Sequence, residues 1–155
     1  LCHIPGATET FEVVAPSPAE CASLVLTAPP MQGGEYLSAT VLQTIWEALD
    51  RWGERFYGRV YTEAEQTLCL SRTHPLRFWA MRFAAKEAFS KAIGFGMRHG
   101  IRWRDIEVTH NRYGRPELVL HGRALKACQE AGIKGSFLTL TDENEYAVAV
   151  VVLEI

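Results

Sequence analysis

The chain has 155 residues, of which 48% are hydrophobic and 22% charged, a composition typical of a single soluble globular domain that is long enough to bury a core. The longest apolar run, residues 146–153, is far too short to span a bilayer. Four scattered cysteines without a CxxC pair argue against a zinc site or a disulfide scaffold. Together with the lack of a signal-like opening segment, they predict a cytoplasmic protein.

The net charge of −2 conceals an uneven distribution. Residues 51–123 hold fourteen of the sixteen basic residues but only seven of the eighteen acidic ones. An excess of basic charge predicts a surface that attracts polyanions, such as phosphates or an acidic protein. An RNA-binding domain is a weaker interpretation, because it rests on charge alone and no nucleic-acid-binding motif is present.

The first part of the chain is rich in proline and glycine and shows little periodicity. Five of the seven prolines lie within residues 1–38. We expect a short strand at residues 10–14, one or two helical turns at residues 18–26 and a loop at residues 29–34. One domain is expected overall, with residues 39–155 as its body and residues 1–38 as a divergent segment that is a candidate for the first strand.

Helical patterns dominate the next part of the chain. Apolar residues recur at helical spacing from about residue 39, and Gly53 is expected to end that helix. Thr62 and Glu65 form a capping box that starts a second helix. Pro75 precedes a long helix at residues 76–93, whose many alanines and aromatic residues predict burial on most sides.

Strand patterns follow. Alternation predicts strands at residues 105–110 and 117–121, joined by a hairpin-like turn. A short helix at residues 123–131 precedes two further strands, at residues 136–141 and 145–154, with a tight connection between them. Strands paired through hairpins beside grouped helices predict an α+β domain, in which a mainly antiparallel sheet packs against the long buried helix.

Three polar residues near the end of the long helix carry the chemical signal. Glu87, Ser90 and Lys91 share one helix face, and Gly94 and Gly96 follow in a loop whose backbone could approach a ligand closely. A carboxylate, a hydroxyl and an ammonium at such a loop could hold a metal-bound phosphate. The spacing alone favours an ordinary Glu–Lys helix pair, worth about 0.2–0.5 kcal/mol, followed by a routine glycine cap.

Residues 82–96, RFAAKEAFSKAIGFG, contain every fixed position of the pattern RFxxKEAxxKAxGxG. This segment resembles the signature helix of the holo-acyl-carrier-protein synthases, the small 4′-phosphopantetheinyl transferases. Further similar segments lie in order on both sides, from about Ile45 to Glu154, whereas the first forty or so residues do not match. The resemblance implies the 4′-phosphopantetheinyl transferase fold. It also implies transfer of phosphopantetheine from coenzyme A to a serine of an apo acyl carrier protein, with release of 3′,5′-ADP.

The resemblance also implies residue roles. Glu87 matches the family's Mg²⁺ ligand and a helper in deprotonating the attacking hydroxyl, and Lys91 matches its catalytic, phosphate-binding lysine. Phosphoryl transfer needs mainly charge neutralisation and alignment, and Mg²⁺ prefers carboxylates, phosphate oxygens and water. The positions that match contacts to coenzyme A are Ser90, Gly94, Gly96, Arg82, Phe83, Phe56, Arg59 and Pro116.

Partners follow from the same resemblance. The acidic carrier protein is expected to dock on the helix at about residues 39–53, where Arg51 and Arg55 could meet its carboxylates. Thr44 stands where relatives often have an arginine. The family usually forms a symmetric homotrimer with active sites shared between neighbours. No nucleic acid and no membrane is expected as a partner.

The chain departs from the family at the second metal ligand, an aspartate on the first strand. An ungapped count back from Ile45 places Ser38 at that position. Two replacements stay open: Glu35, and Glu12 if residues 10–14 form the first strand and a long insertion follows. Glu12 is the preferred candidate, because the acid-then-aliphatic pattern is kept there.

Two functions therefore remain. The enzyme is the main prediction, because Glu87, Lys91 and Arg82 are all present. The alternative is a non-catalytic relative that binds coenzyme A or a carrier protein. The missing aspartate favours this alternative, as does Phe95, which replaces the small hydroxyl residue usual between the two glycines.

Overall fold

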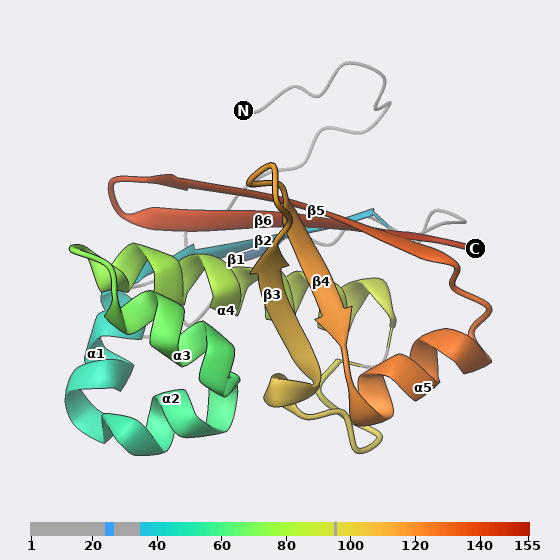
Figure 1. Cartoon of the computed structure of the whole chain (residues 1–155), viewed down its shortest axis with the longest axis horizontal. Coiled ribbons are helices and arrows are strands. Elements are labelled where there is room, and N and C mark those ends of the chain that lie inside the picture. The colour runs from blue at the N-terminus through green and yellow to red at the C-terminus, as the bar shows by residue number, and fades with distance from the viewer. Residues whose placement is uncertain (1–23, 27–34, 95) are drawn as a thin grey trace.

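The computed structural model describes residues 24–26, 35–94 and 96–155. Its main sheet has four antiparallel strands in the order β1-β2-β6-β5 and runs along the top of Figure 1. These strands are β1 (Leu24–Leu26), β2 (Glu35–Val41), β5 (Gly135–Glu143) and β6 (Tyr146–Glu154). The central pair, β2 and β6, is in register from Glu35 opposite Val152 to Val41 opposite Tyr146.

Helix α4 (Pro75–Ala92) crosses one face of this sheet and makes its most extensive contacts with β6 and β2. Strand β6 turns its small residues, Ala147 and Ala149, into the core, and both are fully buried. Ala84 and Ala88 of α4 belong to the same core as Ala149 and are also fully buried. Methyl side chains on both surfaces let the helix axis approach the sheet closely.

Three short helices pack at one end of α4 (Figure 1). They are α1 (Leu42–Trp52), α2 (Glu54–Val60) and α3 (Glu63–Leu70). Their core includes Ile45, Tyr61 and Trp79, and the hydroxyl of Tyr61 donates a hydrogen bond of 2.9 Å to the Trp79 carbonyl. None of the helices in the described part of the chain is long and apolar enough to cross a membrane.

A two-stranded hairpin lies beside α4, in front of it in Figure 1. The 3-10 helix η1 (Trp103–Asp105) leads into β3 (Ile106–His110), which pairs with β4 (Pro116–Leu120), and α5 (Gly122–Glu130) follows. Asn111 organises the turn, since its Oδ1 accepts hydrogen bonds from the backbone N–H groups of Tyr113 and Arg115 at 2.9 and 3.1 Å.

The predicted α+β class, the long buried helix and the capping box of Thr62 and Glu65 are confirmed. The predicted start of the first helix is wrong: residues 39–41 belong to β2, and α1 begins at Leu42. Thr40 is fully buried opposite Ala147, so pairing within the sheet overrides the helical spacing. Gly53 ends α1 as expected, but its positive φ of 48° turns the chain directly into α2, which was not predicted.

Three smaller boundaries also differ. Residues 24–26 form strand β1 instead of part of a helical turn, because they pair with residues 37–39 of β2. Asp105, predicted as the first residue of a strand, ends the 3-10 helix η1, and β3 begins at Ile106. Asp142 and Glu143, predicted in the connection, extend β5 by pairing with Ala147 and Tyr146. The strand expected at residues 10–14 and the loop at residues 29–34 lie outside the described residues.

The close approach of α4 to the sheet predicts that Ala88→Leu destabilises the protein by about 1–3 kcal/mol, because a buried position without space must shift its neighbours. Urea unfolding measures this free energy. The same apolar side chain at an exposed position, Gln129→Leu on α5, should change it by no more than about 0.5 kcal/mol. Equal stabilities for the two variants would show that the helix and the sheet are loosely packed.

Candidate active site

The charged side chains of Glu87 and Lys91 form a half-buried polar stripe along α4. Residues four apart on a helix lie one above the other, which places Phe83, Glu87 and Lys91 in one row. The side chains of Glu87 and Lys91 are 16% and 26% exposed, and Nζ of Lys91 lies 3.7 Å from Oε2 of Glu87. Burial raises the pKa of Glu87, and the Lys91 ammonium offsets part of this rise. A carboxylate in this setting gains more from a nearby cation than an exposed one would.

The loop after α4 is tied to the helix end by backbone hydrogen bonds. The N–H of Gly96 donates to the Ser90 carbonyl at 2.8 Å, and that of Gly94 donates to the Lys91 carbonyl at 2.9 Å. Both glycines have positive φ, 82° at Gly94 and 61° at Gly96, which disfavours other residues. Apart from the adjacent residues of the chain, no described residue has an atom within 4 Å of a Cβ built at either position, so this side of the loop is open among the described residues. The Ser90 hydroxyl donates to the Glu87 carbonyl at 2.8 Å.

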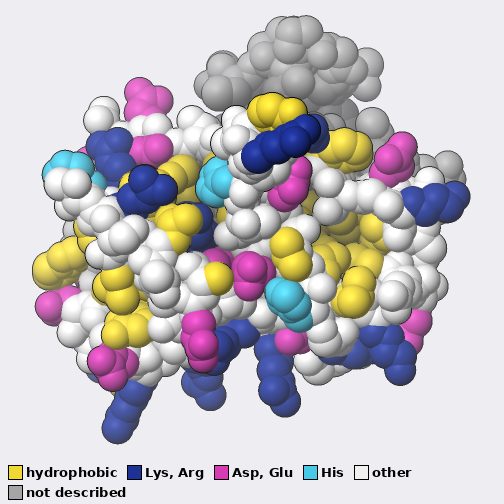
Figure 2. All heavy atoms as spheres, viewed as in Figure 1, with side chains coloured by type: hydrophobic (Ala, Val, Ile, Leu, Met, Phe, Trp, Pro, Cys, Tyr) yellow, Lys and Arg dark blue, Asp and Glu magenta, His cyan; other side chains and the backbone are white. Residues whose placement is uncertain are grey.

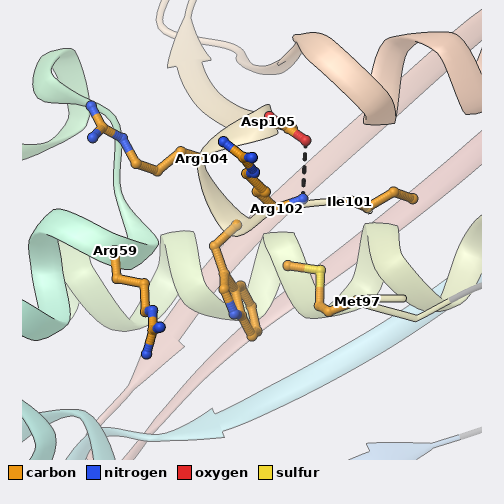
Figure 3. Close-up of a pocket in the computed structure, with 7 residues that line it drawn as sticks. Arg59, Met97, Ile101, Arg102, Arg104 and Asp105 are labelled. Carbon is orange, nitrogen blue, oxygen red and sulfur yellow. Dashed lines mark hydrogen bonds between the residues drawn. The ribbon is translucent and has the colours of Figure 1, made fainter. Parts of the chain in front are cut away.

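A pocket of about 660 Å³ lies beyond this loop. Figure 3 shows Arg59 approaching it from α2, and Arg102 and Asp105 from the segment that leads into β3. Its lining residues are Arg59, Met97, Ile101, Arg102, Trp103, Arg104 and Asp105. Three guanidinium groups against one carboxylate give the pocket an excess of positive charge, which suits a ligand that carries phosphate groups.

Aromatic contacts connect the stripe to the pocket. The ring of Phe83 stacks on that of Trp103, with centroids 4.9 Å apart and an interplanar angle of 21°. The ring centroid of Phe56 lies 6.4 Å from that of Phe83. The structure thus links Phe56 and Phe83, both predicted to contact coenzyme A, to Trp103, which lines the pocket with Arg59.

Arg82 lies elsewhere, although it was predicted to contact the same ligand. It precedes Glu87 by five residues and Lys91 by nine, which places it about 140° and about 180° from them around α4. Its side chain is 1% exposed; Nη1 donates to the Phe78 carbonyl at 3.3 Å, whereas Nε and Nη2 have no hydrogen-bond partner among the described residues. Pro116 is also remote from the pocket, because it pairs with His110 at the opposite end of the hairpin from η1.

Arg82, Arg72 and His110 form a second basic group. The pKa of His110 is lowered by burial first, and then by the positive charges of Arg82 and Arg72. A buried guanidinium with unpaired N–H groups beside a further arginine and a histidine is a site that an anion would stabilise.

Arg51 and Arg55, predicted to bind the carrier, are both exposed. The guanidinium of Arg51 lies over the ring of Trp52 at 4.9 Å, and Trp52 is 52% exposed. Figure 2 shows lysine and arginine side chains projecting from the lower edge of the molecule, where Figure 1 places α2. This edge could face an acidic partner.

Glu87 fits one position in a magnesium site, since it is a half-buried carboxylate whose side chain keeps 16% exposure. No group of three or more histidine, cysteine, aspartate or glutamate side chains that could hold a metal ion occurs within the described ranges. Ser38 lies in β2 opposite Ala149, and Glu35 begins that strand opposite Val152. Glu12 lies outside the described residues. Asp142 forms an ion pair with Arg77, in which Nη1 of Arg77 lies 2.7 Å from Oδ2 of Asp142.

Sequence reasoning missed several residues around the pocket. Arg102, Trp103 and Arg104 form a basic and aromatic run shortly after the glycine loop, and that run was a usable signal. It also missed Lys86, a charged residue within a helical stretch predicted to be buried, whose ammonium pairs with Glu65 at 2.8 Å. A charge at such a position requires an internal partner.

Comparisons with known proteins identify the family of the chain. Residues 43–151 match the model of the 4′-phosphopantetheinyl transferase superfamily. A holo-(acyl-carrier-protein) synthase of Koribacter versatilis is 46% identical over 110 residues, which cover 71% of this chain and 88% of the relative. A second such synthase, from Geobacter sulfurreducens, is 44% identical over 100 residues, or 64% of this chain and 79% of the relative.

Solved structures give the same result. The holo-(acyl-carrier-protein) synthase of Neisseria meningitidis superposes with a TM-score of 0.73 at 36% identity, covering 79% of this chain and 98% of that one. The Bacillus anthracis synthase, solved in complex with CoA (3′,5′-ADP), gives a TM-score of 0.65 at 32% identity, and the match covers 78% of this chain and 95% of that one. The chain therefore belongs to the 4′-phosphopantetheinyl transferase superfamily, in the family of the holo-(acyl-carrier-protein) synthases, and is an enzyme of this type.

Proposed function

We propose that the protein transfers 4′-phosphopantetheine from coenzyme A to a serine of an apo acyl carrier protein, with Mg²⁺ as cofactor and 3′,5′-ADP as the second product. The observation that carries this proposal is the Glu87–Lys91 stripe, which lies beside an open glycine loop and leads to an arginine-lined pocket. The bound ligand in the similar Bacillus anthracis structure supports coenzyme A as the donor.

The chain's own residues divide the work. The serine oxygen attacks the β-phosphate, and the bond to the leaving 3′,5′-ADP breaks. Lys91 compensates the negative charge that develops on the bridging oxygen. Glu87 would hold the Mg²⁺ ion, which neutralises phosphate charge when bound. The arginines of the pocket and the glycine loop hold the remainder of the donor in line, which is the larger part of catalysis in phosphoryl transfer.

The second metal ligand has two candidates. Strand β2 directly precedes α1, which is the place that the ungapped count gives to the relatives' first strand. This arrangement supports Glu35, near the start of β2, and needs no insertion. Glu12 stays open as the alternative ligand. The proposed boundary between the divergent segment, residues 1–38, and the body of the domain, residues 39–155, also stays open, and it falls inside β2.

A homotrimer with shared active sites explains the position of Arg82. Arg82 lies on the opposite side of α4 from Lys91, and Pro116 is remote from the pocket, so both could contact the same nucleotide as Lys91 if the two sides came from different copies. The outer face of the sheet offers an apolar surface for such contacts: Val148, Val150 and Val152 of β6 are half-buried, and Phe137 of β5, opposite Val152, is 46% exposed. Closed symmetric assemblies bury such faces.

The carrier is proposed to meet Arg51 and Arg55. We also place the reaction in the cytoplasm, which suits the free thiols of Cys69 and Cys128. A non-catalytic relative that binds coenzyme A or a carrier is the second candidate, and the absence of a carboxylate at Ser38 favours it.

Incubation with coenzyme A, Mg²⁺ and an apo carrier should increase the carrier's mass by one phosphopantetheine. Glu87→Gln and Lys91→Ala should each lower kcat/KM at least about 100-fold, because both groups act on charge in the transition state. Glu130→Gln and Lys126→Ala, the same changes on exposed α5, should leave kcat/KM unchanged. Coenzyme A binding without any mass gain, across several carriers, would establish the non-catalytic alternative.

The same assay separates the candidates for the second metal ligand. Whichever of Glu35→Gln and Glu12→Gln raises the Mg²⁺ concentration needed for half-maximal rate identifies that residue, since a lost carboxylate weakens the metal site. If neither variant changes the Mg²⁺ concentration needed for half-maximal rate, neither Glu35 nor Glu12 is the second metal ligand.

Shared active sites predict recovery of activity by mixing. Lys91→Ala and Arg82→Gln variants, each inactive alone, should regain about a quarter of wild-type activity when coexpressed, because about one site in four would combine two intact halves. Lys91→Ala mixed with Glu87→Gln is the matched control and should regain nothing, since both changes affect the same stripe. No recovery in the first mixture, with mixed oligomers present, would show that each copy works alone.

The Arg82 group predicts a titration effect. The pKa of His110, measured by NMR, should lie below 6.5, and Arg72→Met should raise it partly, because one positive neighbour is lost while burial persists. Saturating 3′,5′-ADP should also raise it if a phosphate binds at Arg82, since negative charge stabilises the imidazolium. Binding of 3′,5′-ADP without any shift would exclude Arg82 as a nucleotide contact.

A further inference from the structure

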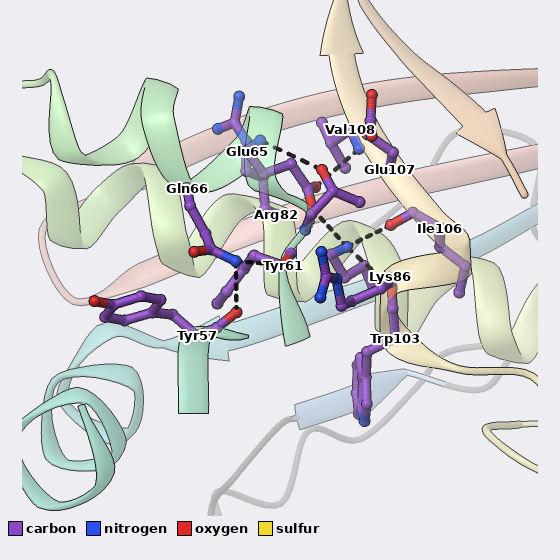
Figure 4. A network of polar contacts seen from close by, with 12 residues as sticks. Tyr57, Tyr61, Glu65, Gln66, Arg82, Lys86, Trp103, Ile106, Glu107 and Val108 are labelled. Carbon is purple, nitrogen blue, oxygen red and sulfur yellow. Dashed lines mark hydrogen bonds and ion pairs between the residues drawn. The ribbon is translucent and has the colours of Figure 1, made fainter. Parts of the chain in front are cut away.

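A buried ion pair connects four elements at the centre of the molecule (Figure 4). The side chains of Lys86 on α4 and Glu65 on α3 are both 0% exposed, and Nζ of Lys86 lies 2.8 Å from Oε2 of Glu65. The backbone N–H of Thr62 donates to Oε2 of Glu65 and that of Val108 donates to Oε1, each at 2.9 Å. The carboxylate is therefore fully engaged by α3, β3 and α4.

The other bonds of the ammonium are directed at η1. Nζ of Lys86 donates to the Trp103 carbonyl at 3.0 Å and to the Ile106 carbonyl. Trp103 is the first residue of η1, and Ile106 is its C-cap. One side chain of α4 thus holds both ends of the short segment that supplies Trp103, Arg104 and Asp105 to the pocket.

This arrangement fixes the pocket relative to the polar stripe. Lys86 and Glu87 are neighbours in sequence, so their side chains leave α4 about 100° apart. Lys86 holds η1 while the side chain of Glu87 stays 16% exposed, and the ring of Trp103 stacks on Phe83 in the same row as Glu87. A shift of η1 would therefore change the distance between the pocket wall and the groups that meet the pyrophosphate.

Stability alone is a weak reason for such a pair. Two charges lose their hydration on burial, and replacement of a buried ion pair by neutral residues of similar volume is often neutral or stabilising. Burial lowers the pKa of Lys86, and Glu65 opposes that effect. Specification of geometry is the better-supported use of a fully bonded buried pair.

We propose that Lys86 and Glu65 are positioning residues for catalysis: they hold η1 so that the pocket binds the donor with its pyrophosphate at Glu87 and Lys91. This inference rests on the proposed function. It predicts that loss of the ammonium weakens donor binding without removing any group that touches the donor, because misplaced binding groups lose much of their effect.

The test uses two charge-neutral double variants. Glu65→Gln with Lys86→Met keeps the volume and leaves no unpaired charge, but it removes both bonds to η1. We expect its KM for coenzyme A to rise at least about tenfold, with a smaller change in kcat. Glu65→Gln with Lys86→Gln supplies amide N–H donors again and should return KM part of the way towards wild type. Calorimetry gives the dissociation constant of coenzyme A for each protein.

A matched control separates positioning from general destabilisation. Tyr61→Phe removes the buried bond to the Trp79 carbonyl beside the same network but does not touch η1. It should lower the melting temperature yet keep the wild-type KM. The N–H of Asp105 donates to the Arg102 carbonyl within the η1 segment. Amide hydrogen exchange at Asp105 should accelerate in the double variant Glu65→Gln with Lys86→Met, and it should not accelerate in Tyr61→Phe.

The outcomes distinguish this inference from the proposed function. An active wild type whose double variants fold and keep the wild-type KM would overturn the positioning role alone. Failure of both double variants to fold would also overturn it, in favour of a purely structural pair. A wild type that binds coenzyme A without transfer would reject the proposed function, and the dissociation constants would then decide the positioning role. No coenzyme A binding by wild type would reject both.

Discussion

The close packing of α4 on β2 and β6 determines where polar groups can act. Alanines at the contact bring the helix against the sheet, and α1, α3 and the β3–β4 hairpin cover most of the rest of its surface. The row of Phe83, Glu87 and Lys91 stays half exposed in the C-terminal half of the helix. Two other charged residues of this helix, Arg82 and Lys86, are buried and require a partner within the protein or from a ligand.

Lys86 and Arg82 meet this requirement differently. Lys86 has an internal carboxylate and two carbonyl groups, so it is complete without a ligand. Nη1 of Arg82 has one hydrogen bond of 3.3 Å, and its Nε and Nη2 have no partner within the part of the chain that the structure describes. The first arrangement suits a fixed scaffold and the second an incomplete binding site. The proposal of active sites shared between copies follows from this contrast, since Arg82 and Lys91 lie on opposite sides of one helix.

The sequence was informative where structure depends on neighbours along the chain. The capping box at Thr62, the position of α4 after Pro75 and the shared face of Glu87 and Lys91 all follow from local rules. The start of α1, the 3-10 turn η1 and the pair of Glu65 with Lys86 depend on contacts between distant segments. Residues 21 apart meet only when α3 packs on α4, and no local periodicity encodes that distance.

The charges of the site complement those of the proposed substrate. A diphosphate carries more negative charge than one lysine can balance, and the stripe adds a carboxylate of its own. Burial raises the pKa of Glu87 and so disfavours its charged form, and a divalent cation beside the carboxylate would favour that form again. The 3.7 Å between Glu87 and Lys91 is too long for a hydrogen bond, so neither group is committed to the other. A cation at Glu87 and a phosphate at Lys91 would therefore stabilise both groups at once, and the arginines of the pocket are left to hold the remainder of the donor.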